Sequence, residues 1–158
     1  MPAMEVTIAG LSQATSMRST SLWMSLVGSR PIFGNGAFPR SDKFVSLNGR
    51  VAVGNRYRDA VFVSIHFNSA SNRGATGIET FYYTPQSELL AYLVHANVIH
   101  KTRTVDRGVK HRGFRVIRNS RNPSILVEGG FLSNRGECRR CISRTHRQKL
   151  AESESALE

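Results

Sequence analysis

Two side chains suited to hydrolytic chemistry follow the two most apolar runs of this chain. His66 comes directly after residues 60–65, and Glu128 comes directly after residues 124–127. Ligand sites of open α/β sheets gather at the carboxyl ends of strands, so this imidazole and this carboxylate could meet. A neutral imidazole can hold zinc, and a carboxylate can take a proton from water. Considered singly, a His at a strand end is more often a structural residue, and a Glu before Gly-Gly is more often solvated.

The elements that would position these residues alternate between strand and helix from residue 41 onward. Short apolar runs predict strands, and apolar residues at helical spacing predict helices. Their alternation predicts an α/β layer fold. The expected strands are 60–65, 78–83, 114–117 and 124–127, and the expected helices are one through Val53 that Ser41 and Asp42 would cap, one from Pro85 through Ile99, and one over 137–152.

Residues 1–40 have a different character. Residues 11–21 are rich in Ser, Thr and Met without a helical or alternating period, and residues 34–39 have the composition of a loop. We expect no regular structure in this segment. The expected domain organisation is therefore a non-matching segment at 1–40, a domain at 41–153 and a tail at 154–158.

Composition and charge narrow the class of partner. The 158 residues, 40% of them hydrophobic, suffice for one domain with a core. A net charge of +11 favours polyanions, which could be nucleic acid, anionic lipid or acidic wall polymers. The basic residues are scattered and no helix shows a basic stripe, so nucleic acid is the less favoured partner. No apolar run approaches the ~20 residues of a membrane span, and residues 1–5 show no export signal.

The two cysteines, Cys138 and Cys141, have the C-x-x-C spacing of some zinc sites, and His146 follows them. A structural zinc site needs a further ligand, and none is apparent nearby. We therefore interpret the pair as two reduced thiols without a function of their own.

Several segments carry a resemblance to one family of enzymes. Residues 64–69, Ser-Ile-His-Phe-Asn-Ser, and 126–134, Leu-Val-Glu-Gly-Gly-Phe-Leu-Ser-Asn, resemble signature segments of the zinc-dependent N-acetylmuramoyl-L-alanine amidases. The resemblance extends from about residue 41 to residue 150, and its pieces follow in the right order. The linking pieces are 40–50, 77–79 with 82–83, 106–110 and 114–116.

The resemblance implies both a fold and a function. The fold would be a single three-layer α/β domain with a mixed, twisted sheet flanked by helices, here lacking its first strand and helix and so left with an unpaired edge. The function would be hydrolysis of the amide bond between N-acetylmuramic acid and L-alanine in peptidoglycan, by a periplasmic or extracellular monomer. The resemblance makes His66 a zinc ligand, Glu128 the catalytic carboxylate, and Asn68 and Arg107 substrate contacts.

The zinc site implied by this resemblance is incomplete. Catalytic zinc normally takes three protein ligands. The family supplies two of them earlier, a His in a Gly-His-Gly-Gly turn and a Glu in a Glu-Lys pair, and residues 1–40 contain neither motif and no histidine. Three hypotheses remain open: an impaired amidase, a working hydrolase that recruits Glu79 or His111 as a substitute ligand, and a non-catalytic basic module that binds anionic wall polymer or nucleic acid.

The genetic code offers a reason for the missing ligands. Permitted codons for residues 2–10, read from their third base, encode Gly-His-Gly-Gly-His-Asp-Arg-Gly, and the same shift over residues 17–29 can encode the Glu-Lys segment. At two positions the shifted codon is forced, whichever codons are used. The last base of the Met4 codon and the first two of the Glu5 codon must encode Gly, and the same bases of Trp23 and Met24 must encode Asp. The hypothesis is a frameshift: residues up to about Phe38 would be translated out of frame relative to an ancestral amidase.

Overall fold

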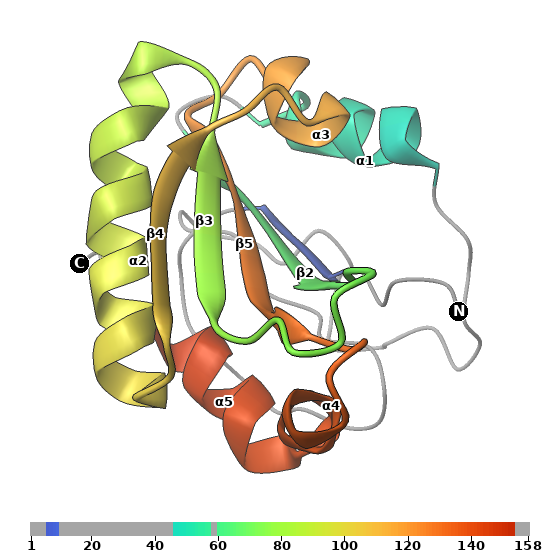
Figure 1. The fold of residues 1–158 in the computed structure, drawn as a ribbon. Coiled ribbons are helices and arrows are strands. Elements are labelled where there is room, and N and C mark those ends of the chain that lie inside the picture. Colours follow the sequence, from blue (N-terminus) through green and yellow to red (C-terminus); the bar gives the residue numbers. More distant parts are fainter. Residues whose placement is uncertain (1–5, 10–45, 58–59, 154–158) are drawn as a thin grey trace.

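The computed structural model describes residues 6–9, 46–57 and 60–153 and arranges them as a mixed sheet with helices on both faces (Figure 1). The order of strands is β1-β2-β5-β3-β4. β2 and β5 are parallel, as are β3 and β4, whereas β1 runs antiparallel to β2 and β3 antiparallel to β5. The expected α/β class with a mixed sheet is confirmed. The strands are β1 (Val6–Ala9), β2 (Phe62–Asn68), β3 (Ile78–Tyr82), β4 (Asp106–His111) and β5 (Ser124–Phe131).

The helices bury the two faces of the sheet unequally. The larger core lies between the sheet and the helices α2, α4 and α5, and the smaller core lies between the sheet and α1 and α3. Figure 1 shows α2 running alongside β4 and β3, with α1 and α3 together at one end of the sheet. No helix within the described residues is long and apolar enough to cross a membrane. The helices are α1 (Leu47–Gly54), the short 3₁₀ helix η2 (Pro85–Ser87), α2 (Glu88–Thr102), α3 (Arg115–Arg118), α4 (Arg135–Ile142) and α5 (Arg144–Glu152).

Alternation along β2 explains how one strand serves both cores and the candidate site. Val63, Ile65 and Phe67 belong to the larger core on the α2 side. Phe62 belongs to the smaller core on the other side. Since successive side chains of a strand point to opposite faces, His66 shares the face of Phe62. The strand is therefore anchored by its odd-numbered residues and presents its even-numbered residues to the opposite face.

The edge of β2 is paired, contrary to expectation. Val6–Ala9 forms β1 and pairs with β2 from Val6 opposite Ile65 to Ala9 opposite Phe62. Its residues, Val-Thr-Ile-Ala, include β-branched side chains that favour strands, and an open sheet edge offers unpaired backbone groups to such a segment. The expectation that residues 1–40 lack regular structure is therefore wrong for residues 6–9. The remainder of that segment, the expected cap at residues 41–42 and the tail at 154–158 lie outside the described residues.

The structure differs from the local predictions at three other places. Residues 114–117 were expected to form a strand, but Phe114 precedes the helix α3, in which Val116 and Ile117 are both buried. Adjacent buried residues suit a helix packed against α1 better than a strand with alternating faces. β4 was not predicted, because a largely polar edge strand lacks an apolar pattern. The expected helix over 137–152 is broken at Ser143, whose extended backbone ends α4 and whose side chain caps α5.

Candidate active site

His66 and Glu128 lie side by side on the central parallel strands. Glu128 of β5 is the register partner of His66 of β2, and on its other side it is the partner of Glu79 of β3. Register partners point to the same face of a sheet, so the three side chains form one row across three strands. The sequence predicted that this His and this Glu could meet, and the register places them in adjacent positions.

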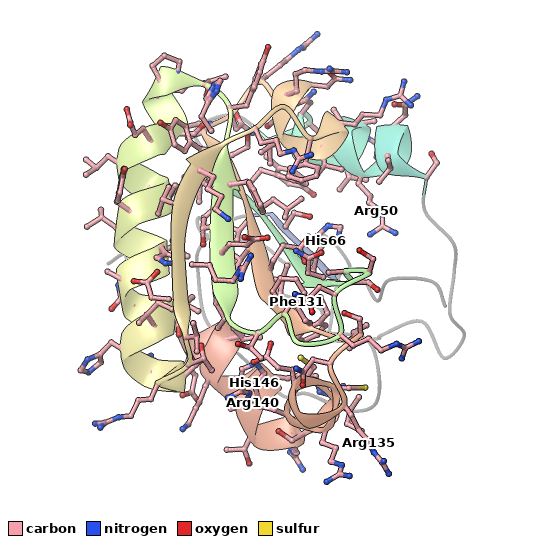
Figure 2. All side chains as sticks on the ribbon, in the orientation of Figure 1. Arg50, His66, Phe131, Arg135, Arg140 and His146 are labelled. Atoms are coloured by element: carbon pink, nitrogen blue, oxygen red, sulfur yellow. The ribbon has the colours of Figure 1, made fainter. Side chains whose placement is uncertain are left out.

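The row occupies the sheet face that carries the smaller core. Phe62 and Leu126 point to this face and pack in the cluster with α1 and α3. His66 and Glu128 lie farther along the same two strands, beyond that cluster. Figure 2 shows the side chain of Arg50 extending from α1 toward the part of the sheet where His66 lies. The face therefore combines a packed apolar end with an end that carries ionisable groups.

The imidazole of His66 is oriented from within its own strand. The Ser64 hydroxyl lies 2.9 Å from Nε2 of His66, and Ser64 is fully buried. The two residues are neighbours on one face because the strand repeats every second residue. The Ser64 hydroxyl therefore engages Nε2 and restrains the ring.

The carboxylate of Glu128 lies within β5, not at its end as the sequence suggested. The strand continues to Phe131, and the register moves from His66 opposite Glu128 to Asn68 opposite Phe131. One more residue is thus accommodated on β5 than on β2 in this interval, which is a bulge. Gly130 makes it possible, since its φ of 139° is a conformation that other residues rarely adopt. Glu128 itself is buried, with 9% of its surface exposed.

Glu79 is the centre of a polar network on the same face. Asn68 Nδ2 donates to its Oε1 at 2.8 Å, and Arg107 Nε donates to its Oε2 at 3.2 Å. Lys110 also donates to Oε2. Burial alone would raise the pKa of Glu79, but the hydrogen bonds and charges of Lys110 and Arg107 outweigh it and hold that pKa below its ordinary value. Asn68 and Arg107, which the resemblance made substrate contacts, therefore meet at a buried, ionised carboxylate.

The described residues do not fit a three-ligand zinc site. Among them, no three His, Cys, Asp or Glu side chains converge in a way that could hold a metal. Glu79 is engaged by its three donors, and His111 lies against Tyr83, whose backbone oxygen is 2.8 Å from its Nε2. His111 is level with the start of β5, because its β3 partner Tyr82 pairs with Ile125. The contacts of Glu79 and His111 among the described residues therefore do not support either residue as a substitute ligand.

Cys141 of the C-x-x-C pair packs behind the strand that carries Glu128. Both cysteines are free thiols, and Cys141 is buried in the larger core. Burial raises the pKa of the Cys141 thiol to about 12, so it stays protonated. His146 lies on the same side of the sheet, and its Nε2 is 2.8 Å from the backbone oxygen of Gly129. These residues pack and hydrogen-bond behind β5 and do not reach the face with the row.

Glu137 is a structural partner of the site that the sequence analysis missed. Its Oε2 accepts hydrogen bonds from the backbone N–H of Gly77 at 3.0 Å and of Phe131 at 2.9 Å, and Arg140 donates to its other oxygen. The carboxylate therefore joins the start of β3, the end of β5 and α4. The spacing of Asn134 and Glu137, which is that of a helix cap followed by an acidic residue, was the available signal.

Comparison with solved structures places this fold in a known class. The catalytic domain of the N-acetylmuramoyl-L-alanine amidase CwlV from Bacillus (Paenibacillus) polymyxa var. colistinus is 32% identical with a TM-score of 0.70, over 74% of this chain and 65% of that one. The N-acetylmuramoyl-L-alanine amidase of Clostridium difficile 630 is 33% identical with a TM-score of 0.70, over 84% of this chain and 69% of that one. The fold is therefore that of a cell-wall amidase catalytic domain.

Sequence comparison gives the family. The profile described as N-acetylmuramoyl-L-alanine amidase matches residues 38–156. The sporulation-specific N-acetylmuramoyl-L-alanine amidase of Bacillus subtilis is 33% identical over 114 residues, which cover 70% of this chain and 44% of that protein. The uncharacterized protein YqiI of the same organism is 36% identical over 115 residues, which cover 55% of it. This chain belongs to the N-acetylmuramoyl-L-alanine amidase family, and it spans about half the length of these curated relatives.

Proposed function

We propose that this chain is a peptidoglycan amidase whose catalytic carboxylate, Glu128, is retained within an impaired site. The reaction is hydrolysis of the amide bond between N-acetylmuramic acid and L-alanine. The observation that carries the proposal is the register pairing of His66 with Glu128 on one face of the sheet. Family membership supports the choice of substrate, and a cell-wall substrate favours a periplasmic or extracellular location for a monomeric enzyme.

Glu128 is suited to the proton transfers of amide hydrolysis. A carboxylate beside the scissile bond can accept a proton from the attacking water and then pass it to the departing amine of L-alanine. Its position inside a hydrogen-bonded strand, between the partner strands β2 and β3, holds it with little freedom. We propose that Asn68 and Arg107 contact the substrate from the same face, while Glu79 holds both in place.

The impairment follows from the ligand set. His66 is the one residue here that matches the family's zinc ligands, and the described residues offer no substitute. The described residues therefore do not fit the metal. We propose a slow residual hydrolysis that depends on Glu128.

Hydrolysis of a soluble N-acetylmuramoyl-L-alanyl peptide tests this proposal. The readout is release of a new L-alanine amino terminus, with Glu128→Gln as the test variant and Glu88→Gln, an exposed glutamate of α2, as the matched control. We expect slow release that falls by about a hundredfold or more in Glu128→Gln and is unchanged in Glu88→Gln. Release that persists in Glu128→Gln would reject the role of Glu128, and no release from the parent chain would reject residual activity.

We propose a shifted reading frame as the origin of the missing ligands. Sequencing the codons of residues 1–38 tests it directly, since those codons must yield the two missing motifs when read from the third base. A chain re-encoded in that frame before residue 39 provides a functional test. We expect it to bind zinc tightly and to hydrolyse the peptide faster than the parent chain by about a hundredfold or more. Codons that cannot encode the motifs would end the hypothesis.

A further inference from the structure

A bulge in β4 brings two cations to the face that carries the active-site row. Ile78 pairs with Asp106 and Thr80 pairs with Val109, so β4 has one residue more than β3 in this interval. In a regular strand, residues three apart point to opposite faces. The extra residue changes this alternation, and Arg107 and Lys110 both reach the carboxylate of Glu79.

Gly108 is the residue that permits the bulge. Its φ is 80°, in the region that favours glycine, and a Cβ built on it would meet nothing within 4 Å. The need for glycine is therefore conformational and not steric. Bulges commonly re-aim side chains beside functional sites, and this one aims two positive charges at a single carboxylate.

The two cations have capacity for a further anion. Glu79 is 7% exposed, whereas the side chains of Arg107 and Lys110 are 36% and 43% exposed. Their hydrogen-bond acceptors among the described residues are Glu79 and, for Arg107, the backbone oxygen of Thr76. A guanidinium and an ammonium carry more N–H donors than these contacts use.

Aromatic rings hold both cations in position. The Arg107 guanidinium lies 5.0 Å from the centre of the Phe131 ring, and the Lys110 ammonium lies 5.9 Å from the centre of the Phe81 ring. Such contacts restrict a long side chain without neutralising its charge. The cations are therefore fixed and partly exposed, which suits binding of a ligand better than a solvated surface residue does.

The distance across the sheet suggests which ligand group reaches them. The charged groups of Arg107 and Lys110 reach over to Glu79 on β3, and Glu79 is the register partner of Glu128 on β5. Neighbouring strands are about 4.8 Å apart, so about one strand spacing separates the cations from Glu128. An extended peptide advances about 3.3–3.6 Å per residue. A carboxylate about one to two residues beyond the scissile amide would thus lie over the cations when that amide lies at Glu128.

We infer that Arg107 and Lys110, aimed by the Gly108 bulge and anchored by Glu79, form a subsite for a carboxylate of the bound stem peptide. This inference rests on the proposed amidase function and adds to it a specificity for acidic peptides. Lys110 is added by this inference to the proposed substrate contacts Asn68 and Arg107. A neutral amide in place of the carboxylate would lose the charge-assisted hydrogen bonds.

Equilibrium binding tests the subsite without requiring hydrolysis. Calorimetric titration of the full chain would compare N-acetylmuramoyl-L-alanyl-D-glutamic acid with the same compound carrying both glutamate carboxyls as amides. We expect the acid to bind about tenfold more tightly than the diamide. Equal affinity of the two compounds, or no binding of the acid, would overturn the inference, and this comparison needs no variant to fold.

Variants then assign the effect to its residue. We expect Lys110→Met to remove most of the preference for the acid, Lys110→Arg to restore it, and Lys149→Met, which removes an exposed cation from α5, to leave it intact. A preference that is unchanged in a folded Lys110→Met chain would also overturn the inference. If the chain does not hydrolyse the peptide but still prefers the acid, only the proposed function is rejected. If Glu128-dependent hydrolysis is observed without a preference for the acid, only the subsite is rejected.

Discussion

His66 and Glu128 occupy one register position on two adjacent parallel strands, so an imidazole and a buried carboxylate are neighbours on one face of the sheet. Neither residue owes this placement to sequence proximity, since 62 positions separate them by number (128 − 66). Backbone hydrogen bonds of β2 and β5 fix their relative position, and this fixed geometry is what a proton-transfer site needs.

Zinc affinity reports whether the ligand set is complete. With a single imidazole from the family's set, we expect weak and non-stoichiometric binding of zinc by this chain. His66→Ala should then change the binding isotherm only slightly. Calorimetric titration of zinc into chelator-treated protein provides the measurement. Tight one-to-one binding that His66→Ala abolishes would show that a complete site exists.

Glu137 should contribute strongly to stability. Replacing it with Ala leaves the backbone N–H groups of Gly77 and Phe131 without their carboxylate acceptor, so we expect a loss of about 2–4 kcal/mol in the free energy of unfolding. Glu137→Gln keeps an acceptor oxygen and should cost less. Urea unfolding measures both variants, with Glu88→Gln as an exposed control within about 0.5 kcal/mol of the parent. A neutral Glu137→Ala would contradict this assignment.

His146 should make stability depend on pH in mildly acidic solution. Burial lowers its pKa below the ordinary value of 6.5, although the bond to the Gly129 oxygen opposes this shift. The unfolded chain then takes up a proton at higher pH than the folded chain does. The stabilisation is therefore complete above pH 6.5 and declines as pH falls from there through the folded-state pKa.

The difference between two pH–stability curves isolates this effect. His146→Gln should be less dependent on pH than the parent in the range just below 6.5. His100→Gln, an exposed substitution on α2, should follow the parent curve. Thermal or urea unfolding across that pH range provides the data. Parallel curves for the parent and His146→Gln would show that His146 does not titrate on unfolding.

Gly108 should resist substitution for a conformational reason. Ala at this position meets no atom within 4 Å but must adopt a φ of 80°, so we expect Gly108→Ala to destabilise the fold by about 1–2 kcal/mol. Gly136→Ala, within the first turn of α4, should instead be neutral or stabilising, because Ala favours helices. Unfolding in urea measures both. An unaltered stability of Gly108→Ala would indicate that the bulge can relax.

The local sequence predicted the elements whose pattern is strong. The buried strands β2 and β5 follow from continuous apolar runs, and α2 follows from its helical spacing. The sequence failed where the pattern is weak or ambiguous. β4 is largely polar, and residues 114–117 contain β-branched side chains that favour a strand although two adjacent ones, Val116 and Ile117, are buried as in a helix. In both cases contacts with other elements, β3 and α1, decide the conformation, and a local window does not contain them.

By itself, the sequence determined the family, the chemical identity of His66 and Glu128, and the absence of the family's other ligand motifs from residues 1–40. The tertiary structure alone decided that Glu79 joins their row and that Lys110 shares a face with Arg107. The physical reason is that residue types are local properties, whereas register and bulges are set by pairing between strands far apart in the chain. A shift of one residue in that pairing would send the same side chains to the opposite face.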